Sequence, residues 1–309
     1  MTDRSRRALS RIGLGTAQFG MAYGVTNRRG RVALDEARRI LAAGHRAGIR
    51  VIDTAAFYGE TEAVLGVLED AACGFRIITK TPPIAAERIG AAEAEEVRLM
   101  LARSRQNLRR RRLDGVLVHH GQELLRPGGE RILDVLREAK ARGEVERIGV
   151  SVYDPDELAA VLKRFTPDLV QLPLNLLDQR FAASGVLTRL KAMGAEIHAR
   201  SLFLQGTLLV APAALPPPLD DASAVFAAVA EFLAAHGLDP LAGCLAYGLS
   251  LAEIDCLILG ATAAEELDAI LAAARNLPRS LPDFAALAVS DAAIIDPRRW
   301  RLSPGKAAL

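Results

Sequence analysis

Short apolar runs alternate with amphipathic stretches of helix length along almost the whole chain. An apolar run of about four to eight residues between turn signals is typical of a buried parallel strand, whereas apolar positions three or four apart are typical of a helix. The pattern predicts eight strands. They lie at residues 12–15, 49–53, 75–80, 115–119, 147–151, 169–172, 196–200 and 256–260.

The amphipathic stretches between these strands predict helices. The clearest of them lie at residues 34–47, 93–108, 131–142, 156–164 and 223–235. Asp35 and Glu36 place negative charge in the first turn of the first helix, where the helix dipole favours it. Gly48 and Gly143 follow two of the stretches, at positions typical of helix ends.

This alternation of strands and helices indicates the fold class, which is α/β. Eight repeats without a composition change to mark a linker favour a closed (β/α)8 barrel, or TIM barrel, over an open doubly wound sheet. We expect one domain over residues 1–309, with a C-terminal tail from about residue 279. A Rossmann domain would open with Gly-x-Gly-x-x-Gly, and residues 13–18 lack the third glycine.

Polar residues follow three of the predicted strands at the point where each strand ends. Asp53, Lys80 and His119 end apolar runs, and Tyr58 lies on the loop after Asp53. Catalytic groups of a (β/α)8 barrel come from the carboxyl ends of several strands, which lie at one face. The sequence therefore predicts an active site that contains these four side chains.

The composition is that of an ordinary globular protein: of 309 residues, half are hydrophobic and a quarter charged, and the formal net charge is +2. So small a charge gives no argument for binding to nucleic acid or to an acidic membrane. The basic segment 103–112 is better explained as a helix end than as an anion site. Cys73, Cys244 and Cys256 are scattered and predict neither disulfides nor a zinc site. No apolar segment has signal-peptide or membrane-spanning length, so we expect a cytoplasmic protein.

Several short motifs follow one another in a fixed order. They are GLGT at 13–16, IDTAAFYG at 52–59, the strand-end Lys80, LVH at 117–119, IGVS at 148–151 and Gln171. From about residue 11 to about residue 270, this order resembles the signatures of the aldo/keto reductases. The resemblance implies a nicotinamide cofactor in extended form at the carboxyl face of the barrel, and reversible reduction of aldehydes or ketones. Segments 173–180 and 197–206 are similar to a bacterial branch often associated with sugar or surface-polysaccharide metabolism.

The four polar residues also suit this reaction by their chemistry. Hydride that reaches a carbonyl carbon leaves negative charge on the oxygen, so the site needs a proton donor and a further donor near that oxygen. We assign Tyr58 as the acid. Lys80 would lower the phenol pKa from its ordinary value of about 10, and Asp53 would neutralise Lys80. His119 would orient the carbonyl.

Each of these residues has a structural interpretation as well. Tyr58 alone would cover an apolar rim, Lys80 would reach solvent and Asp53 would cap a turn. His119 could be a core imidazole, and because adjacent side chains of a strand point to opposite faces, only one of His119 and His120 is expected to face the site. The family pattern selects His119, and the joint position at successive strand ends favours catalysis.

The resemblance also implies cofactor contacts. Ser151 and Gln171 would bind the nicotinamide carboxamide, although Val152 replaces the asparagine that is common after the serine. Arg200 stands where an aromatic residue often stacks on the nicotinamide, and it would either stack there or pair with a nearby carboxylate. The other implied contacts are Thr16 in the first motif, Ser201, Leu202, Gln205 and Gly206 along the pyrophosphate, and Gly260, Thr262 and Glu266 at the adenosine end.

The adenosine end bears on the choice between the two nicotinamide cofactors. The helix that begins after Thr262 would present free backbone donors suited to a phosphate. Many relatives add a lysine or arginine there for the 2′-phosphate of NADP, but residues 256–274 contain neither and include Glu265 and Glu266. Carboxylates would repel that phosphate or accept from the 2′-hydroxyl of NAD. Family habit favours NADP(H), which we prefer, and local charge favours NAD(H).

Other segments and other functions stay open. We expect the proline-rich segment 212–218 to be a stiff loop on the active-site face that could cover a ligand, and Trp300 to anchor the tail. A small-molecule carbonyl substrate is the expected partner, while its identity and the oligomeric state are undetermined. The alternative function is a cofactor-binding regulatory protein on the same fold. A metal-dependent barrel hydrolase using His119, His120 and His198 is disfavoured because no His-x-His pair is present, so no metal is expected.

Overall fold

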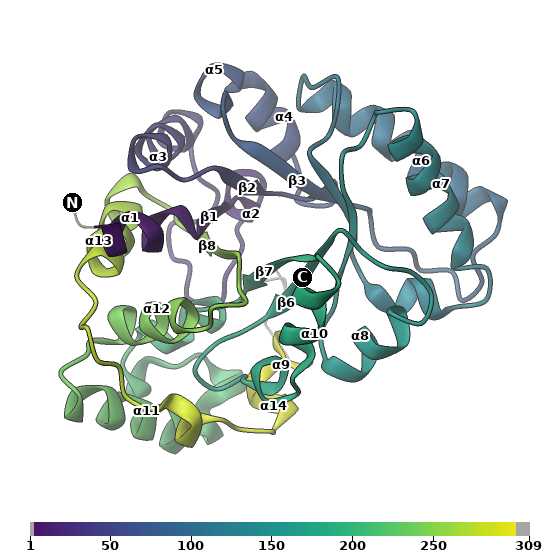
Figure 1. Ribbon diagram of the computed structural model, residues 1–309. Coiled ribbons are helices and arrows are strands. Elements are labelled where there is room, and N and C mark those ends of the chain that lie inside the picture. Colours follow the sequence, from purple (N-terminus) through teal and green to yellow (C-terminus); the bar gives the residue numbers. More distant parts are fainter. Residues whose placement is uncertain (1–2, 301–309) are drawn as a thin grey trace.

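The computed structural model describes residues 3–300 and places eight parallel strands in a closed barrel, in the order of the sequence (Figure 1). The strands are β1 Ile12–Gly15, β2 Val51–Asp53, β3 Arg76–Lys80, β4 Gly115–Val118, β5 Ile148–Ser151, β6 Leu169–Pro173, β7 Glu196–Arg200 and β8 Cys256–Gly260. The predicted (β/α)8 barrel is therefore confirmed. Each predicted strand is present, with its ends within two residues of the expected positions.

Helices surround the barrel (Figure 1). They are α1 Asp3–Ser10, α2 Ala17–Gly20, α3 Leu34–Ala47, α4 Thr61–Val67, α5 Glu69–Ala72, α6 Ala91–Asn107, α7 Glu130–Ala141, α8 Pro155–Val161, α9 Arg180–Ala183, α10 Val186–Ala192, α11 Ser223–Ala235, α12 Pro240–Ser250, α13 Ala264–Arg275 and α14 Ala292–Ile295. Gly48 ends α3 with a φ of 93°, and its N–H donates to the carbonyls of Gly44 and His45. A left-handed residue of this kind is the expected stop signal.

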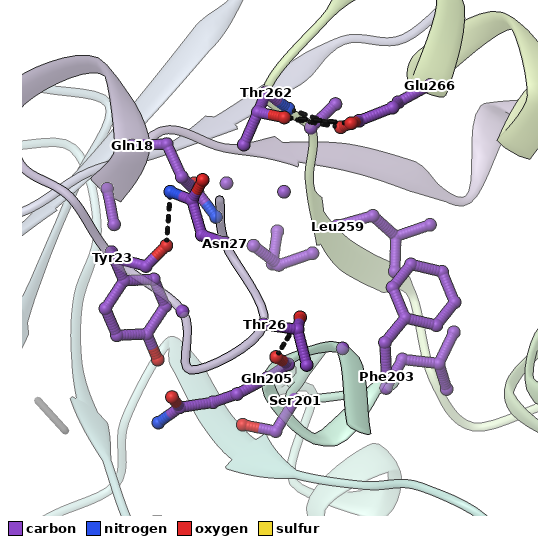
Figure 2. A pocket seen from close by; sticks show the side chains of 18 of the residues that line it. Gln18, Tyr23, Thr26, Asn27, Ser201, Phe203, Gln205, Leu259, Thr262 and Glu266 are labelled. Carbon is purple, nitrogen blue, oxygen red and sulfur yellow. Dashed lines mark hydrogen bonds between the residues drawn. The ribbon is translucent and has the colours of Figure 1, made fainter. Parts of the chain in front are cut away.

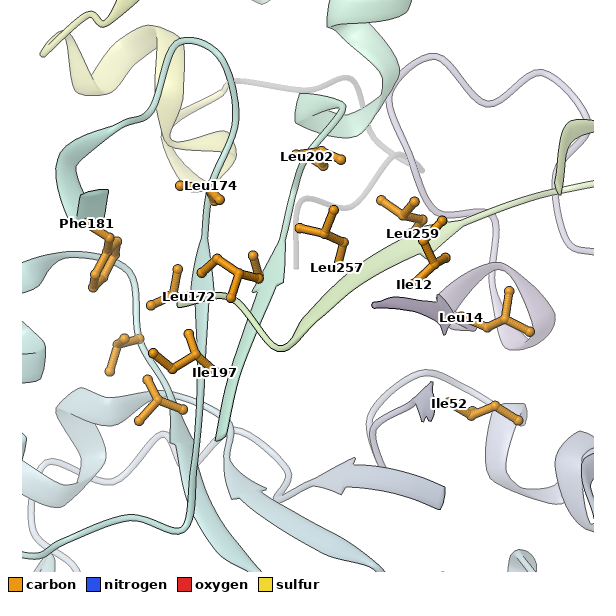
Figure 3. Close-up of a cluster of buried hydrophobic side chains, with 14 of the residues drawn as sticks. Ile12, Leu14, Ile52, Leu172, Leu174, Phe181, Ile197, Leu202, Leu257 and Leu259 are labelled. Atoms are coloured by element: carbon orange, nitrogen blue, oxygen red, sulfur yellow. The ribbon is translucent and has the colours of Figure 1, made fainter. Parts of the chain in front are cut away.

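Side-chain alternation along the strands divides the buried residues into two layers. Ile12, Leu14, Ile52 and Ile197 belong to the large layer between the strands and the helices (Figure 3). A smaller cluster fills the barrel interior; it contains Val51, Ile78, Leu117, Leu169, Cys256 and Ile258. Two residues further along their strands, the next inward positions are Asp53, Lys80, His119 and Gln171. The alternation thus directs polar side chains into the carboxyl end of the barrel.

The amino end of the barrel holds a separate group of charges. Glu196 accepts from Arg147 at 2.7 Å and also contacts Arg76 and, at 2.8 Å, the His198 ring. His198 is fully buried in this arrangement. The contact of His198 with Glu196 is therefore a structural one. Within residues 3–300, no group of three or more histidines, cysteines or acidic residues could hold a metal ion.

The proline-rich segment and the tail both pack against helices. Residues 212–218 fall in two 3-10 turns, Pro212–Ala214 and Pro217–Ala222, which lie against α11. None of residues 212–217 lines the cavity that opens beside Asp53 and Tyr58, so the expectation that the segment covers a ligand is not supported. Trp300 is buried and donates from Nε1 to the Ala293 carbonyl at 3.0 Å, which confirms it as a packing anchor.

No single helix in the described part of the chain is long and apolar enough to cross a membrane. The segments Leu219–Ala235 and Pro240–Ser250 pass the test only as a pair, by length and composition, and they are bent by 84° at the break between them.

Candidate active site

The four predicted polar residues meet at the carboxyl end of the barrel. Lys80, at the end of β3, is almost fully buried, with 1% of its surface exposed. Its ammonium lies 2.7 Å from both carboxylate oxygens of Asp53 at the end of β2, 2.9 Å from the Thr54 carbonyl and 3.5 Å from the hydroxyl of Tyr58. The ion pair offsets much of the cost of burying the cation.

Tyr58 is held in place by the turn that follows β2. Its N–H donates to the Ala55 carbonyl at 3.0 Å, and its own carbonyl accepts from the Thr61 hydroxyl at 2.7 Å. Gly59 follows with a φ of 57°, and a Cβ there would lie 2.6 Å from the Gly20 carbonyl oxygen. Only glycine fits this close, left-handed position. The turn therefore fixes the phenol over Lys80, whose Nζ lies 5.1 Å from the ring centre.

The protonation of Tyr58 differs from the expectation. Burial raises the pKa of the phenol, the Asp53 carboxylate raises it further, and Arg200 opposes both. The prediction that Lys80 lowers this pKa is wrong for the protein alone, because Asp53 balances the ammonium and burial has the largest effect. Burial likewise lowers the pKa of Lys80, against the Asp53 carboxylate, which raises it. Tyr58 is thus a neutral phenol that can give up a proton to a developing oxyanion.

His119 lies beside Tyr58, with ring centres 5.9 Å apart. It is buried, whereas the side chain of the adjacent His120 is about one-third exposed and approaches Glu123 at 3.5 Å. Burial, together with the charge of Lys80, lowers the pKa of His119 well below its usual value. A neutral imidazole has one N–H to donate and matches the predicted role of orienting a carbonyl.

A cavity of about 440 Å³ opens from this group toward the edges of β7, β8 and β1. Asp53, Tyr58 and Arg200 line its inner end. The other predicted cofactor residues on its walls are Thr16, Ser201, Leu202, Gln205, Gly206, Gly260, Thr262 and Glu266. Figure 2 shows Gln18, Tyr23 and Asn27 across the cavity from Phe203 and Leu259. The structure therefore brings these predicted residues together along one elongated space.

Ser151 and Gln171 lie deeper and do not line this cavity. They are paired neighbours on β5 and β6, and both are buried. Gln171 donates from Nε2 to an Asp53 carboxylate oxygen at 2.7 Å, which links it to the Asp53–Lys80 ion pair. Its Oε1 has no hydrogen-bond partner within the described residues. A buried carbonyl oxygen without a donor is available to a ligand amide.

With this geometry established, comparison with known proteins decides the family. A model of the aldo/keto reductase family matches residues 11–288. The chain belongs to the aldo/keto reductase family. It is accordingly an NAD(P)-dependent oxidoreductase. No curated protein matches the chain.

Solved aldo-keto reductases share the fold. The Bacillus halodurans aldo-keto reductase, in its holo form, is similar with a TM-score of 0.69 and 18% identity, over 94% of this chain and 95% of that one. A Pseudomonas aeruginosa protein assigned to the aldo-keto reductases has a TM-score of 0.65 and 21% identity, over 86% of this chain and 90% of that one. At such identities the likeness concerns the fold.

In this aldo/keto reductase the loop between α2 and α3 forms one wall of the cavity, which the sequence patterns did not predict. Thr26 donates from its hydroxyl to the Gln205 carbonyl at 3.0 Å, and the Val25 N–H donates to Gln205 Oε1 at 3.2 Å. A Cβ on Gly206, whose φ is 88°, would lie 2.1 Å from the Thr26 hydroxyl. The turn sequence Asn-Arg-Arg-Gly at 27–30 could have indicated this wall, because it follows the first motif in the chain.

The end of the cavity around Thr262 and Glu266, where the adenosine is expected, is less acidic than residues 256–274 suggest. Glu266 accepts from the Thr262 N–H at 2.7 Å and from the Thr262 hydroxyl (Figure 2), and it lies 3.7 Å from the Arg29 guanidinium. Glu265 pairs with Arg39 on α3. The opening of α13 is also less free than expected, because Glu36 accepts the Ala264 N–H at 2.6 Å. One of the backbone donors at the start of this helix is therefore occupied within the protein.

The sequence left two interpretations of Arg200, which were stacking on the nicotinamide and an ion pair with a nearby carboxylate. The structure does not show the ion pair. The guanidinium of Arg200 lies over the ring of Tyr153, 4.3 Å from the ring centre. It donates to the Val152 carbonyl at 3.2 Å and to the Ser201 hydroxyl at 3.3 Å. Within residues 3–300 no carboxylate lies within ion-pair distance of it. Stacking of Arg200 on a nicotinamide stays a prediction.

Proposed function

We propose that this enzyme reduces an aldehyde or ketone to an alcohol with NAD(P)H, and that Tyr58 supplies the proton. The contact of the Lys80 ammonium with both Asp53 and the Tyr58 hydroxyl carries the proposal. A neutral phenol beside a fixed cation can donate to the carbonyl oxygen as negative charge develops there. His119 donates a second hydrogen bond to the same oxygen, and Asp53 holds Lys80 in position.

The residues of the cavity fit a dinucleotide. When bound, the nicotinamide supplies the hydride. Ser151 and Gln171 would hold its carboxamide, and the unpartnered Oε1 of Gln171 supports this assignment. The other proposed contacts follow the cavity from one end to the other: Thr16 and Arg200 near the nicotinamide, Ser201, Leu202, Gln205 and Gly206 at the pyrophosphate, and Gly260, Thr262 and Glu266 at the adenosine.

Within that site we propose NADP(H) as the preferred cofactor, with NAD(H) as the alternative. Arg28 and Arg29 line the cavity at the end where Thr262 and Glu266 lie, and they supply the positive charge that residues 256–274 lack. A phosphate attracts guanidinium groups strongly. Glu266 supports the alternative, because a carboxylate can accept from a ribose hydroxyl.

The two cofactors can be separated by one substitution. Arg29→Ala should weaken NADPH binding about tenfold and leave NADH binding nearly unchanged, because only NADPH carries the 2′-phosphate. Fluorescence titration of the protein with each cofactor measures both dissociation constants. Arg31→Ala is the matched control, since Arg31 lies on the same segment but pairs with Glu60 at 2.8 Å. Tighter binding of NADH than of NADPH by the wild type, with no loss of NADPH affinity in Arg29→Ala, would point to NAD(H).

The pKa directions also predict the pH profile. His119 loses its proton well below its usual range, and Tyr58 keeps its proton above its usual range. Neither group therefore titrates between about pH 6 and pH 8, and kcat for carbonyl reduction should stay level there. The profile is measured with the cofactor saturating. A step in this range that disappears in His119→Asn would contradict the neutral imidazole.

A panel of aldehydes and ketones, including sugar-derived ones, tests the overall function. The signal is the loss of absorbance of the reduced nicotinamide. Turnover with at least one class of carbonyl compound is the expected result. Tight cofactor binding without turnover across the whole panel would favour the regulatory protein instead.

Three free and scattered cysteines support a reducing, cytoplasmic location.

A further inference from the structure

A partly buried cation without a carboxylate partner lies next to the catalytic group. Arg200 is at the end of β7 and lines the same cavity as Asp53 and Tyr58. Its guanidinium contacts a carbonyl, a hydroxyl and an aromatic ring, and none of these carries a negative charge. A charge removed from water in this way is usually paired. The missing anion is therefore expected to come from a ligand.

The guanidinium is held in one position. The Tyr153 ring supports one of its faces at 4.3 Å, while the Val152 carbonyl and the Ser201 hydroxyl accept two of its N–H groups. Ser201 has a left-handed φ of 63°, which places its hydroxyl directly after the strand. An arginine fixed by such contacts loses little side-chain entropy when it binds a planar anion.

A second arginine lies against the Tyr153 ring and, unlike Arg200, has a carboxylate partner. The Arg298 guanidinium lies 3.5 Å from the centre of the Tyr153 ring, but it is paired with Asp296 at 2.7 Å. The charge of Arg298 is therefore balanced within the protein. Of the two guanidinium groups on Tyr153, only Arg200 both lines the cavity and lacks a carboxylate partner among the described residues.

The charges of the inner site add up to an excess of positive charge. Asp53 balances Lys80 at 2.7 Å, and Tyr58 and His119 are neutral. The positive charge of Arg200 is not balanced by any of these groups. Its charge reaches the catalytic group, since it opposes the raised pKa of Tyr58 and contributes to the lowered pKa of His119. The region around the reacting carbonyl is thus complementary to an anion.

We propose that Arg200 binds an anionic group of the substrate, so that the enzyme acts on aldehydes or ketones that also carry a carboxylate or a phosphate. The inference rests on the proposed function, because it names the substrate class of that same site. The anionic group takes no part in the reaction: the carbonyl carbon gains a hydride from the cofactor and the oxygen gains a proton from Tyr58. Both anions accept paired hydrogen bonds from a guanidinium fork.

Substrate pairs that share the carbonyl group, and of which only one member carries an anionic group, test this directly. We compare para-formylbenzoate with its neutral methyl ester, and glyceraldehyde phosphate with glyceraldehyde. In the wild type, kcat/KM for the charged member of at least one pair should exceed that of its partner about tenfold, mainly through a lower KM. The pair with the larger ratio tells carboxylate from phosphate.

Two variants locate the effect. Arg200→Gln should bring the charged-to-neutral ratio close to one, and Arg200→Lys should restore part of it. Arg298→Gln is the matched control, because it removes a guanidinium from the same ring that does not line the cavity, and its ratio should stay at the wild-type value. A wild-type ratio near one for both pairs, or an equal loss in both variants, would overturn the proposal.

A binding measurement keeps the test independent of turnover. Calorimetric titration of the wild type with para-hydroxymethylbenzoate and with its methyl ester should show tighter binding of the carboxylate, and Arg200→Gln should abolish the difference. Equal binding of the two compounds would overturn the substrate-class proposal even if carbonyl reduction is established. A loss of NADPH affinity in Arg200→Gln, with no change in the charged-to-neutral ratio, would limit Arg200 to its proposed contact with the cofactor and overturn its role toward the substrate. Absence of turnover on every carbonyl compound would instead contradict the proposed function.

Discussion

Tyr58→Phe should lower kcat for carbonyl reduction about a thousandfold while NADPH binding stays close to that of the wild type. The substitution removes only the hydroxyl that lies 3.5 Å from Lys80 Nζ, and general acid catalysis by a placed side chain typically contributes about 10² to 10⁴ in rate. Steady-state rates with the best carbonyl substrate measure the effect. Fluorescence titration with NADPH checks that the cavity is intact.

Tyr23 provides the matched control for this substitution. It is a second, partly buried phenol in the same cavity, and burial raises its pKa as well. It has no contact with Lys80, so Tyr23→Phe should keep most of the wild-type kcat. If Tyr23→Phe caused the larger loss, the proton would come from the other phenol and the assignment of Tyr58 would be wrong.

Lys80→Met should both destabilise the protein and slow the reaction. Removal of the ammonium leaves the Asp53 carboxylate buried with only the Gln171 amide as a side-chain donor. Loss of one partner of a buried ion pair costs about 3 to 5 kcal/mol in the free energy of unfolding. The reduction rate should fall as well, because the cation next to Tyr58 is lost. Denaturant unfolding and steady-state kinetics measure the two effects.

The double substitution Lys80→Met with Asp53→Asn separates stability from catalysis. It removes both charges, so the free energy of unfolding should recover most of the loss seen in Lys80→Met. The reduction rate should stay low, since the pair that sets the environment of Tyr58 is still missing. A double variant that regained the rate together with the stability would show that Lys80 acts only through folding.

The barrel and the meeting of the four polar residues at its carboxyl end were predictable from sequence because both follow from strand periodicity. An apolar run that ends in Asp53, Lys80 or Val118–His119 marks the carboxyl end of a strand, and parallel strands bring those ends to one face. The alternation also explains why His119 faces Tyr58 while His120 is partly exposed. The contacts of the catalytic residues thus depend mostly on local sequence and on the closure of the barrel.

Other features depend on contacts between distant segments, which local patterns do not contain. The sign of the pKa change of Tyr58 depends on how deeply the phenol is buried and on the balance of Lys80 by Asp53. The charge at the adenosine end depends on Arg29, which lies far from Glu266 in the sequence. The Ala264 N–H is taken by Glu36 of α3 rather than left free. Such pairings appear only when the elements are placed together.

The central claim is that hydride from the cofactor and a proton from Tyr58 are delivered to one carbonyl group in this cavity. The most direct measurement uses NADPH that carries deuterium at its transferable position and mass spectrometry of the alcohol formed. The wild type should place one deuterium on the carbinol carbon, and Tyr58→Phe should form about a thousandfold less labelled alcohol in the same time. Alcohol without deuterium, or undiminished labelling in Tyr58→Phe, would contradict the account.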